Sequence, residues 1–207
     1  MHDQVYLLDE LSCTIFLHPS TLTPSDILGG RHIKFFAIPD LDQWLEPTAV
    51  PEYHYNFEYE DVAMETSVIL RTSSSTGRPK PIFCPQNVWG QCDGERVIPP
   101  LDGRKTAWIG IVEDNCGRLF SPMPFFHLAG IAYTLACPAY LGITTVIAPA
   151  GRIPNAQLVD EILDHGEIDV AVFPPSLLID MCASHDSLNR LGNLSAIIFG
   201  EGMYSHR

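Results

Sequence analysis

The sequence has little basic charge, with 12 Lys and Arg against 25 Asp and Glu in 207 residues and a formal net charge of −13. A chain this acidic repels nucleic-acid phosphates and anionic lipid surfaces, so both classes of partner are disfavoured. Hydrophobic residues make up 46% of the chain and aromatics 10%. This composition excludes a disordered protein and provides enough apolar material for a sizeable core.

Closely spaced metal or redox ligands are also missing. No two of the six cysteines have the two-residue spacing of a zinc knuckle or a redox dithiol, and the eight histidines do not cluster. We therefore expect no dedicated metal site. Residues 1–11 contain no Lys or Arg, so the basic start of a secretory signal is absent from them. Reduced thiols and a cytoplasmic location are expected.

Charge is absent from residues 128–150, a stretch long enough to span a bilayer. Pro138 and Gly142 interrupt this stretch, and the β-branched run at 143–147 indicates a strand. A buried helix followed by a buried strand is therefore favoured over a membrane span.

Acidic and aromatic residues dominate the first third of the chain. Residues 35–70 contain eight Asp and Glu but no Lys or Arg. The aromatic residues that alternate there with polar ones are Tyr53, Tyr55, Phe57 and Tyr59. This alternation predicts a short strand with one aromatic face, or an extended segment lying across a neighbouring surface. We divide the chain into an N-terminal segment, residues 1–66, and a core, residues 67–207.

Strand and helix patterns alternate through the core. The predicted strands are 67–70, 106–112, 143–147, 168–173 and 194–199. The predicted helices are 128–140, a helix from the N-cap Asn155 through His165, and a short helix after Pro174-Pro175 to about Cys182. Such alternation favours an α/β fold of layered sheets with flanking helices, in which most strands are parallel and buried.

The loop at residues 71–81 concentrates hydroxyl and basic side chains. They are Arg71, Thr72, Ser73, Ser74, Ser75, Thr76, Arg78 and Lys80. Hydroxyls and backbone N–H groups in such a turn can form an anion-binding concavity, for which a phosphate is the natural ligand. The loop is not of the Walker type, because Gly77 is followed by Arg78-Pro79-Lys80. A flexible Ser-rich surface loop explains this segment alone equally well.

Four segments resemble the adenylate-forming (AMP-dependent synthetase/ligase) superfamily. Residues 72–80 resemble its Thr-Ser-Gly-Ser/Thr-Thr-Gly-x-Pro-Lys signature, and residues 123–130 its Phe-Phe-His segment beside the carboxylate pocket. Residues 172–178 resemble its strand and Pro-Pro turn, and residues 194–202 lie where the family has a strand and a Gly-Gly-Ala turn against adenine. The resemblance extends from about Phe35 and is greatest to adenylation domains of fungal-type non-ribosomal-peptide-synthetase-like (NRPS-like) reductases.

The resemblance implies part of the large N-terminal lobe of a ligase that activates a carboxylic acid as acyl-AMP, with ATP and Mg²⁺. It implies that the phosphates would contact Thr72, Ser73, Ser74, Ser75, Thr76, Gly77 and Lys80. Phe126 and His127 would line the acid pocket, and Gly200, Glu201 and Gly202 would approach the adenine. Carrier and reductase domains would be the partners in an intact relative. For Lys80 the alternative is a solvated loop lysine, and for His127 a half-buried residue at a helix start.

The sequence departs from the family pattern at Ser74, where the family has Gly, and at Glu201, which replaces the second Gly of the adenine turn. The family's magnesium-binding Glu, ribose-binding Asp and catalytic Lys belong to motifs that come later than residue 207. We therefore expect no catalytic residue and no magnesium ligand within this chain, and a fragment that is inactive alone. A non-catalytic nucleotide- or partner-binding module, or a relic, is the alternative, and whether the chain is itself an enzyme stays open.

Overall fold

The computed structural model describes residues 2–23, 30–46, 51–72, 80–104, 112 and 116–200. The chain forms two compact units, one of residues 1–62 and 71–83 and the other of residues 63–70 and 84–207. The predicted division between residues 66 and 67 rests on composition and stays a prediction.

The first unit contains a small parallel sheet and short helices. Its elements are α1 (His2–Glu10), β1 (Ile15–Pro19), β2 (Lys34–Ile38), α3 (Leu41–Trp44) and α4 (Tyr59–Val62). Strands β1 and β2 pair in parallel, with Ile15 opposite Lys34. Arg31 joins the loop before β2 to α1, because its Nε and Nη2 atoms donate to the two carboxylate oxygens of Asp9 at 2.6 and 2.8 Å.

The predicted aromatic strand at Tyr53 to Tyr59 is wrong. Residues 51–58 have no regular secondary structure, and Tyr59 begins α4 instead. A strand requires a neighbour to pair its backbone groups, and in the described residues none pairs with this segment. The alternation leaves only a local contact, in which the rings of Tyr55 and Phe57 meet edge to face with centroids 5.5 Å apart.

A two-stranded sheet of β3 (Thr66–Arg71) and β4 (Pro81–Pro85) precedes helix α5 (Asn87–Arg96). Strand β3 confirms the strand predicted at 67–70, whereas β4 and α5 were not predicted. The hydroxyl of Ser67 donates to the Cys84 carbonyl at 3.0 Å and accepts from Trp89 Nε1 at 2.8 Å. These two bonds fasten β3 to both β4 and α5.

A four-stranded parallel sheet lies at the centre of the second unit. Its order is β6 (Thr144–Val146), β5 (Arg118–Phe120), β7 (Val170–Phe173) and β8 (Ala196–Phe199). It confirms the parallel α/β prediction and the strands predicted at 143–147, 168–173 and 194–199. Strand β5 was not predicted. The strand predicted at 106–112 lies outside the described residues except for Val112, which is helical and fully buried.

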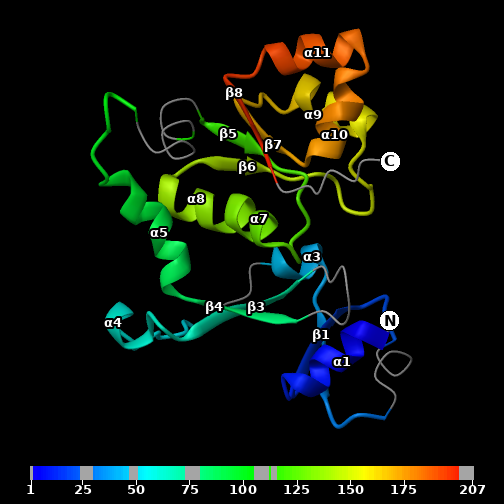
Figure 1. Ribbon diagram of the computed structural model, residues 1–207. Coiled ribbons are helices and arrows are strands. Elements are labelled where there is room, and N and C mark those ends of the chain that lie inside the picture. Colours follow the sequence, from blue (N-terminus) through cyan, green and yellow to red (C-terminus); the bar gives the residue numbers. More distant parts are fainter. Residues whose placement is uncertain are drawn as a thin grey trace. The chain divides into compact units, whose positions relative to one another are not determined.

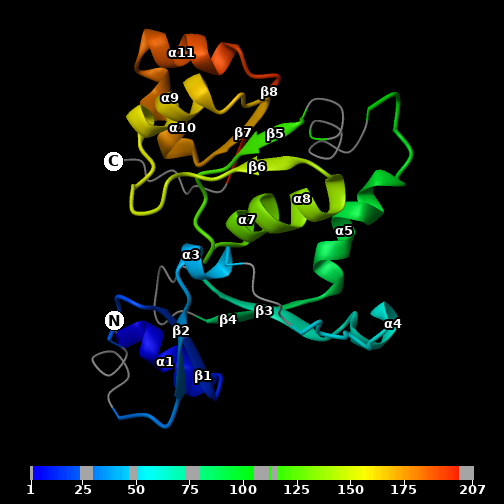
Figure 2. The ribbon, with the colours of Figure 1, turned by 180° about the vertical axis from the view of Figure 1, so that it is seen from behind.

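Helices cover both faces of this sheet (Figures 1 and 2). On one face, Cys137 and Ile143 pack with Leu119, Val170 and Val172. On the other face the helices are α9 (Ala156–His165), α10 (Pro175–Cys182) and α11 (His185–Gly192), whose buried side chains pack on Phe120, Ala171 and Phe173. Successive residues of β7 therefore point to opposite cores, and all four are buried.

The helix predicted at 128–140 is confirmed as a helical run with a π turn inside it. The run consists of α7 (Leu128–Ile131), the π turn η1 (Ala132–Ala136) and α8 (Cys137–Leu141). Pro138 has no N–H to donate to the preceding turn, whereas the Cys137 N–H donates to the Ala132 carbonyl, five residues back. Thr145 of β6 donates its hydroxyl to the Tyr133 carbonyl at 3.0 Å, which ties the wide turn to the sheet.

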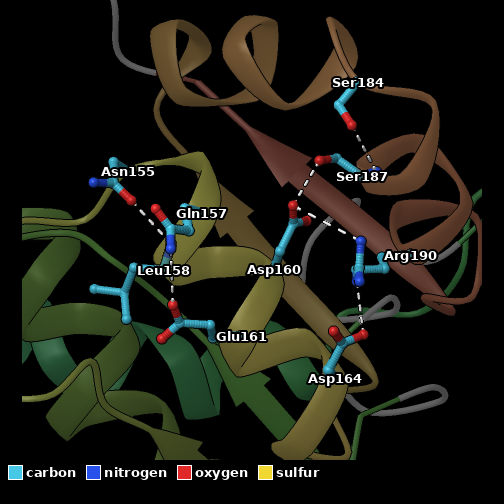
Figure 3. A network of polar contacts seen from close by, with 9 residues as sticks. All are labelled: Asn155, Gln157, Leu158, Asp160, Glu161, Asp164, Ser184, Ser187 and Arg190. Atoms are coloured by element: carbon cyan, nitrogen blue, oxygen red, sulfur yellow. Dashed lines mark hydrogen bonds and ion pairs between the residues drawn. The ribbon is translucent and has the colours of Figure 1, made fainter.

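Polar side chains join α9 to α11 (Figure 3). The predicted N-cap is confirmed, since Asn155 Oδ1 accepts from the Leu158 N–H at 2.9 Å. The Ser187 hydroxyl donates to Asp160 at 2.8 Å, and Arg190 Nε donates to Asp164 at 2.6 Å. Helix α10 confirms the predicted short helix, but α11 was not predicted. None of the helices in the described residues combines the length and apolar character that crossing a bilayer requires.

Candidate functional site

Three loops gather at the carboxyl edge of the central sheet. Strands β5, β7 and β8 end at Phe120, Phe173 and Phe199, and Phe173 lies opposite Phe199 in the parallel register. The segments that follow them therefore emerge at one edge, which is where open α/β sheets bind their ligands. These segments are the loop 121–127, the Pro174-Pro175 turn and Gly200.

The predicted acid-pocket residues lie in the loop after β5. His127 is the N-cap of α7, and its Nδ1 accepts from the Ala129 N–H at 3.3 Å. This hydrogen bond assigns the neutral ring the tautomer that carries its proton on Nε2. His127 and Phe126 are both exposed, Phe126 by 67%. The edge thus presents an aromatic ring beside an imidazole.

Gly130 holds this loop close to α7. A Cβ atom at Gly130 would clash with the Pro124 carbonyl oxygen, and would lie 2.6 Å from Pro124 C and 3.0 Å from Met123 O. Only glycine permits this approach of helix and loop. The sequence signal for it was an isolated glycine inside an apolar helical pattern, to which no role was assigned.

The predicted phosphate loop has a closed neck in the first unit. The Thr72 N–H donates to the Lys80 carbonyl at 3.0 Å, and the Lys80 N–H donates to the Thr72 hydroxyl at 3.0 Å. The two ends of the segment that carries the hydroxyls are therefore held together. Ser73, Ser74, Ser75, Thr76 and Gly77 lie outside the described residues. The Lys80 side chain is exposed.

Of the predicted adenine turn, Gly200 is described, and Glu201 and Gly202 lie outside the described residues. No atom of the described residues lies within 4 Å of a Cβ built at Gly200. Within the described part of the chain, no three His, Cys, Asp or Glu side chains gather into a group that could hold a metal ion.

Asp169 organises the opposite, amino edge of the sheet, and sequence reasoning missed it. Its Oδ2 accepts from the N–H groups of Gly117 and Arg118, both at 2.8 Å, and its carbonyl accepts from the Ser195 N–H at 2.8 Å. One residue thus sets the starts of β5, β7 and β8. No sequence signal marked it, because its partners are backbone groups distant in the chain.

The family model for AMP-binding enzymes matches residues 6–206. Among curated proteins, a carboxylic acid reductase of Neurospora crassa is 25% identical over 201 residues, which are 96% of this chain and 19% of that protein. An isocyanide synthase–NRPS hybrid of Aspergillus fumigatus is 26% identical over 204 residues, 96% of this chain and 13% of that protein. The chain thus spans less than a fifth of the length of either relative.

Solved structures of the same fold cover nearly the whole chain. The N-terminal domain of FACL13 from Mycobacterium tuberculosis, bound to an inhibitor, has a TM-score of 0.71 at 16% identity, covering 97% of this chain and 48% of that one. O-succinylbenzoate CoA synthetase of Bacillus subtilis, in complex with ATP and magnesium, has a TM-score of 0.64 at 14% identity, covering 97% of this chain and 37% of that one. The α/β fold is therefore that of the N-terminal lobe of adenylate-forming enzymes.

Proposed function

Since this chain belongs to the AMP-binding enzyme family, we propose that it takes part in activating a carboxylic acid with ATP as an acyl-adenylate. The observation that carries this proposal is the carboxyl edge of the sheet. There the Phe126-His127 loop, the Pro174-Pro175 turn and Gly200 follow strands β5, β7 and β8. The order of these three segments matches the order that the family resemblance implies.

Each part of the proposed site has a physical role. The hydroxyls and N–H groups of residues 73–77 bind the phosphates, and Lys80 neutralises part of their charge. The Thr72–Lys80 neck supports this role, because it holds the two ends of the hydroxyl-bearing segment together. Phe126 and His127 line the acid pocket. The backbone at Gly200, with Glu201 and Gly202, lies against the adenine.

The chemistry joins two anions, so positioning and charge stabilisation are what the protein contributes. A carboxylate oxygen forms a bond to the α-phosphorus of ATP, the α–β phosphoanhydride bond breaks, and pyrophosphate leaves. Mg²⁺ would enter with the ATP phosphates and lessen their repulsion of the carboxylate. The chain's own residues bind the phosphates, orient the acid beside Nε2 of His127 and exclude water with Phe126.

We expect the 207-residue chain, assayed alone, not to exchange pyrophosphate into ATP. The relatives that support the activity, a carboxylic acid reductase and an isocyanide synthase–NRPS hybrid, are at least five times as long as this chain. Carrier and reductase domains are therefore the proposed partners.

We also propose a cytoplasmic location, supported by the reduced thiols of Cys13, Cys116 and Cys182. A non-catalytic nucleotide-binding module is the second candidate, supported by the same partial coverage.

Nucleotide binding by isothermal calorimetry tests the proposal. We expect MgATP to bind the chain, and Lys80→Ala to weaken binding by about five- to tenfold, as loss of one charge-assisted contact does. Lys34→Ala is the matched control, because Lys34 is an exposed lysine of the same unit outside the loop. Equal losses in both variants, or no ATP binding by the wild-type chain, would contradict the proposal.

A second titration, with a non-hydrolysable acyl-adenylate analogue, tests the acid pocket. His127→Asn removes the imidazole but keeps a side-chain oxygen that can cap α7. We expect it to weaken binding of the analogue about fivefold while ATP affinity is unchanged. His185→Ala, at the exposed start of α11, should change neither. Vigorous pyrophosphate exchange by the chain alone over a panel of aromatic and aliphatic acids would overturn the expected inactivity. Binding of ATP without binding of the acyl-adenylate analogue would favour the nucleotide-binding module.

A further inference from the structure

A pocket of about 260 Å³ lies at the carboxyl edge of the central sheet, on the side that carries α9 and α10. Asn155 at the start of α9 and Leu177 of α10 line it. Leu177 packs in the core on the α9–α11 face, whereas Cys137, which follows the π turn after α7, packs in the core on the other face. Neither Phe126 nor His127 lines the pocket, although its Pro122 and Pro174 come from the same loop and turn as the candidate site.

We propose that this pocket binds an organic cation, an ammonium or guanidinium group on a short apolar stem. Its walls are the rings of Pro122, Pro154 and Pro174 together with Leu177. Proline rings are rigid and have no N–H, so these walls are apolar and lose little conformational entropy when a stem packs on them. The proposal does not depend on nucleotide binding.

Asp180 supplies the negative charge. Its side chain is exposed, lines the pocket, and makes no hydrogen bond or ion pair with the other described residues. Ser176 lies one helical turn earlier on the same face of α10 and adds a hydroxyl acceptor. A carboxylate with an adjacent hydroxyl is a suitable acceptor pair for an ammonium or guanidinium group.

Among the described residues, no basic side chain forms an ion pair with this carboxylate. Between residues 150 and 200 the Lys and Arg residues are Arg152 and Arg190. Arg152 pairs with Glu161 at 2.7 Å, and Arg190 with Asp164 at 2.6 Å. The net charge of −13 also enriches cations around the molecule. An external cation is therefore the partner that Asp180 can take.

An anion is the competing ligand, because two helices begin at the pocket and helix starts attract negative charge. Two features weaken that attraction. The Leu158 N–H of α9 is already bonded to Asn155, and the first residue of α10 is Pro175, which has no N–H. The full charge of Asp180 then exceeds the remaining partial charges, so the pocket selects a cation.

Nuclear magnetic resonance titration of the full chain tests the proposal. The probes are n-butylammonium and agmatine, with n-butanol and butanoate as neutral and anionic matches. We expect both cations to shift the amide signals of Ser176, Leu177 and Asn155 with a Kd on the order of millimolar. Asp180→Asn should weaken this binding about three- to fivefold, the loss expected for one exposed ion pair.

Asp186→Asn is the matched control, since it removes one exposed carboxylate from α11, outside the pocket. If both substitutions weakened cation binding equally, the effect would be general charge attraction and the proposal would be overturned. Tighter binding of butanoate than of n-butylammonium would also overturn it. A tetrapeptide with a central arginine distinguishes the source of the cation. Tighter binding of the peptide than of agmatine would identify a partner's side chain as the ligand, and the reverse order would identify a small molecule.

Discussion

The thiol of Cys116 shows how surroundings change one residue. Burial first, and then the negative charge of Asp169, raise the pKa of Cys116 from its usual 9.0 to about 11. The folded state thus holds this proton more tightly than the unfolded chain does. The contribution of the protonated thiol to folding stability is therefore complete below pH 9 and is lost as the pH rises from about 9 to 11. At neutral pH the thiol stays protonated and a poor nucleophile.

We expect this loss to appear in urea unfolding as a difference between the wild type and Cys116→Ser. The difference in unfolding free energy should fall by roughly 1–2 kcal/mol between pH 8 and 11, after allowance for the partial exposure of the thiol. Cys182→Ser, at an exposed cysteine, should show no such trend. If the difference in unfolding free energy between the wild type and Cys116→Ser did not change with pH, the surroundings of Cys116 would not raise its pKa.

At the scale of elements, the contact between α7 and the loop 121–127 depends on Gly130. Gly130→Ala places a Cβ against the backbone of Met123 and Pro124, so helix and loop must separate. We expect a loss of about 1–3 kcal/mol in urea unfolding, as overpacking costs, and shifted amide signals at Phe126 and His127.

Gly94→Ala in α5 is the matched control for Gly130. A Cβ at Gly94 would meet no atom of the described residues within 4 Å, so alanine should stabilise the helix by about 0.5–1 kcal/mol. Stabilisation by both substitutions would contradict the close approach at Gly130. The opposite signs expected for two helical glycines separate the steric effect from helix propensity.

At the scale of the whole molecule, the two units differ in how well they are packed. Both buried hydrophobic clusters belong to the second unit. In the first unit all five residues of β2 are exposed, and a two-stranded sheet is marginal in stability. We expect amides of β7 to exchange hydrogen at least roughly a hundredfold more slowly than those of β1 and β2.

Hydrogen exchange of the full chain, followed by mass spectrometry, measures this difference. Peptides that cover Val170–Phe173 should retain deuterium protection longest, and peptides that cover Ile15–Pro19 should lose it first. MgATP, if it binds the loop above the Thr72–Lys80 neck, should slow exchange in β3 and β4. Uniform protection across both units would show that they unfold as one cooperative body.

Local patterns predicted the elements whose signals lie within a few residues. The N-cap at Asn155, the β-branched run at 143–147 and the apolar strand at 168–173 are examples. Strand β5 has only three residues, and the eight residues of α11 include only two large apolar side chains, Leu188 and Leu191, so neither was predicted. The aromatic alternation at Tyr53 to Tyr59 had the period of a strand, but a strand also needs a partner, which periodicity does not report.

The identities and chain order of the site segments are properties of the sequence alone, because hydroxyl-rich, aromatic and glycine motifs are local. The meeting of the Phe126-His127 loop, the Pro174-Pro175 turn and Gly200 at one edge of the sheet is not local. It follows from the parallel order β5-β7-β8, from Asp169 bonding to backbone groups about 50 residues earlier in the chain, and from the contact at Gly130. Only the tertiary structure decided these features. Each one joins two segments of the chain, and the number of residues between two segments does not determine how far apart they lie in space.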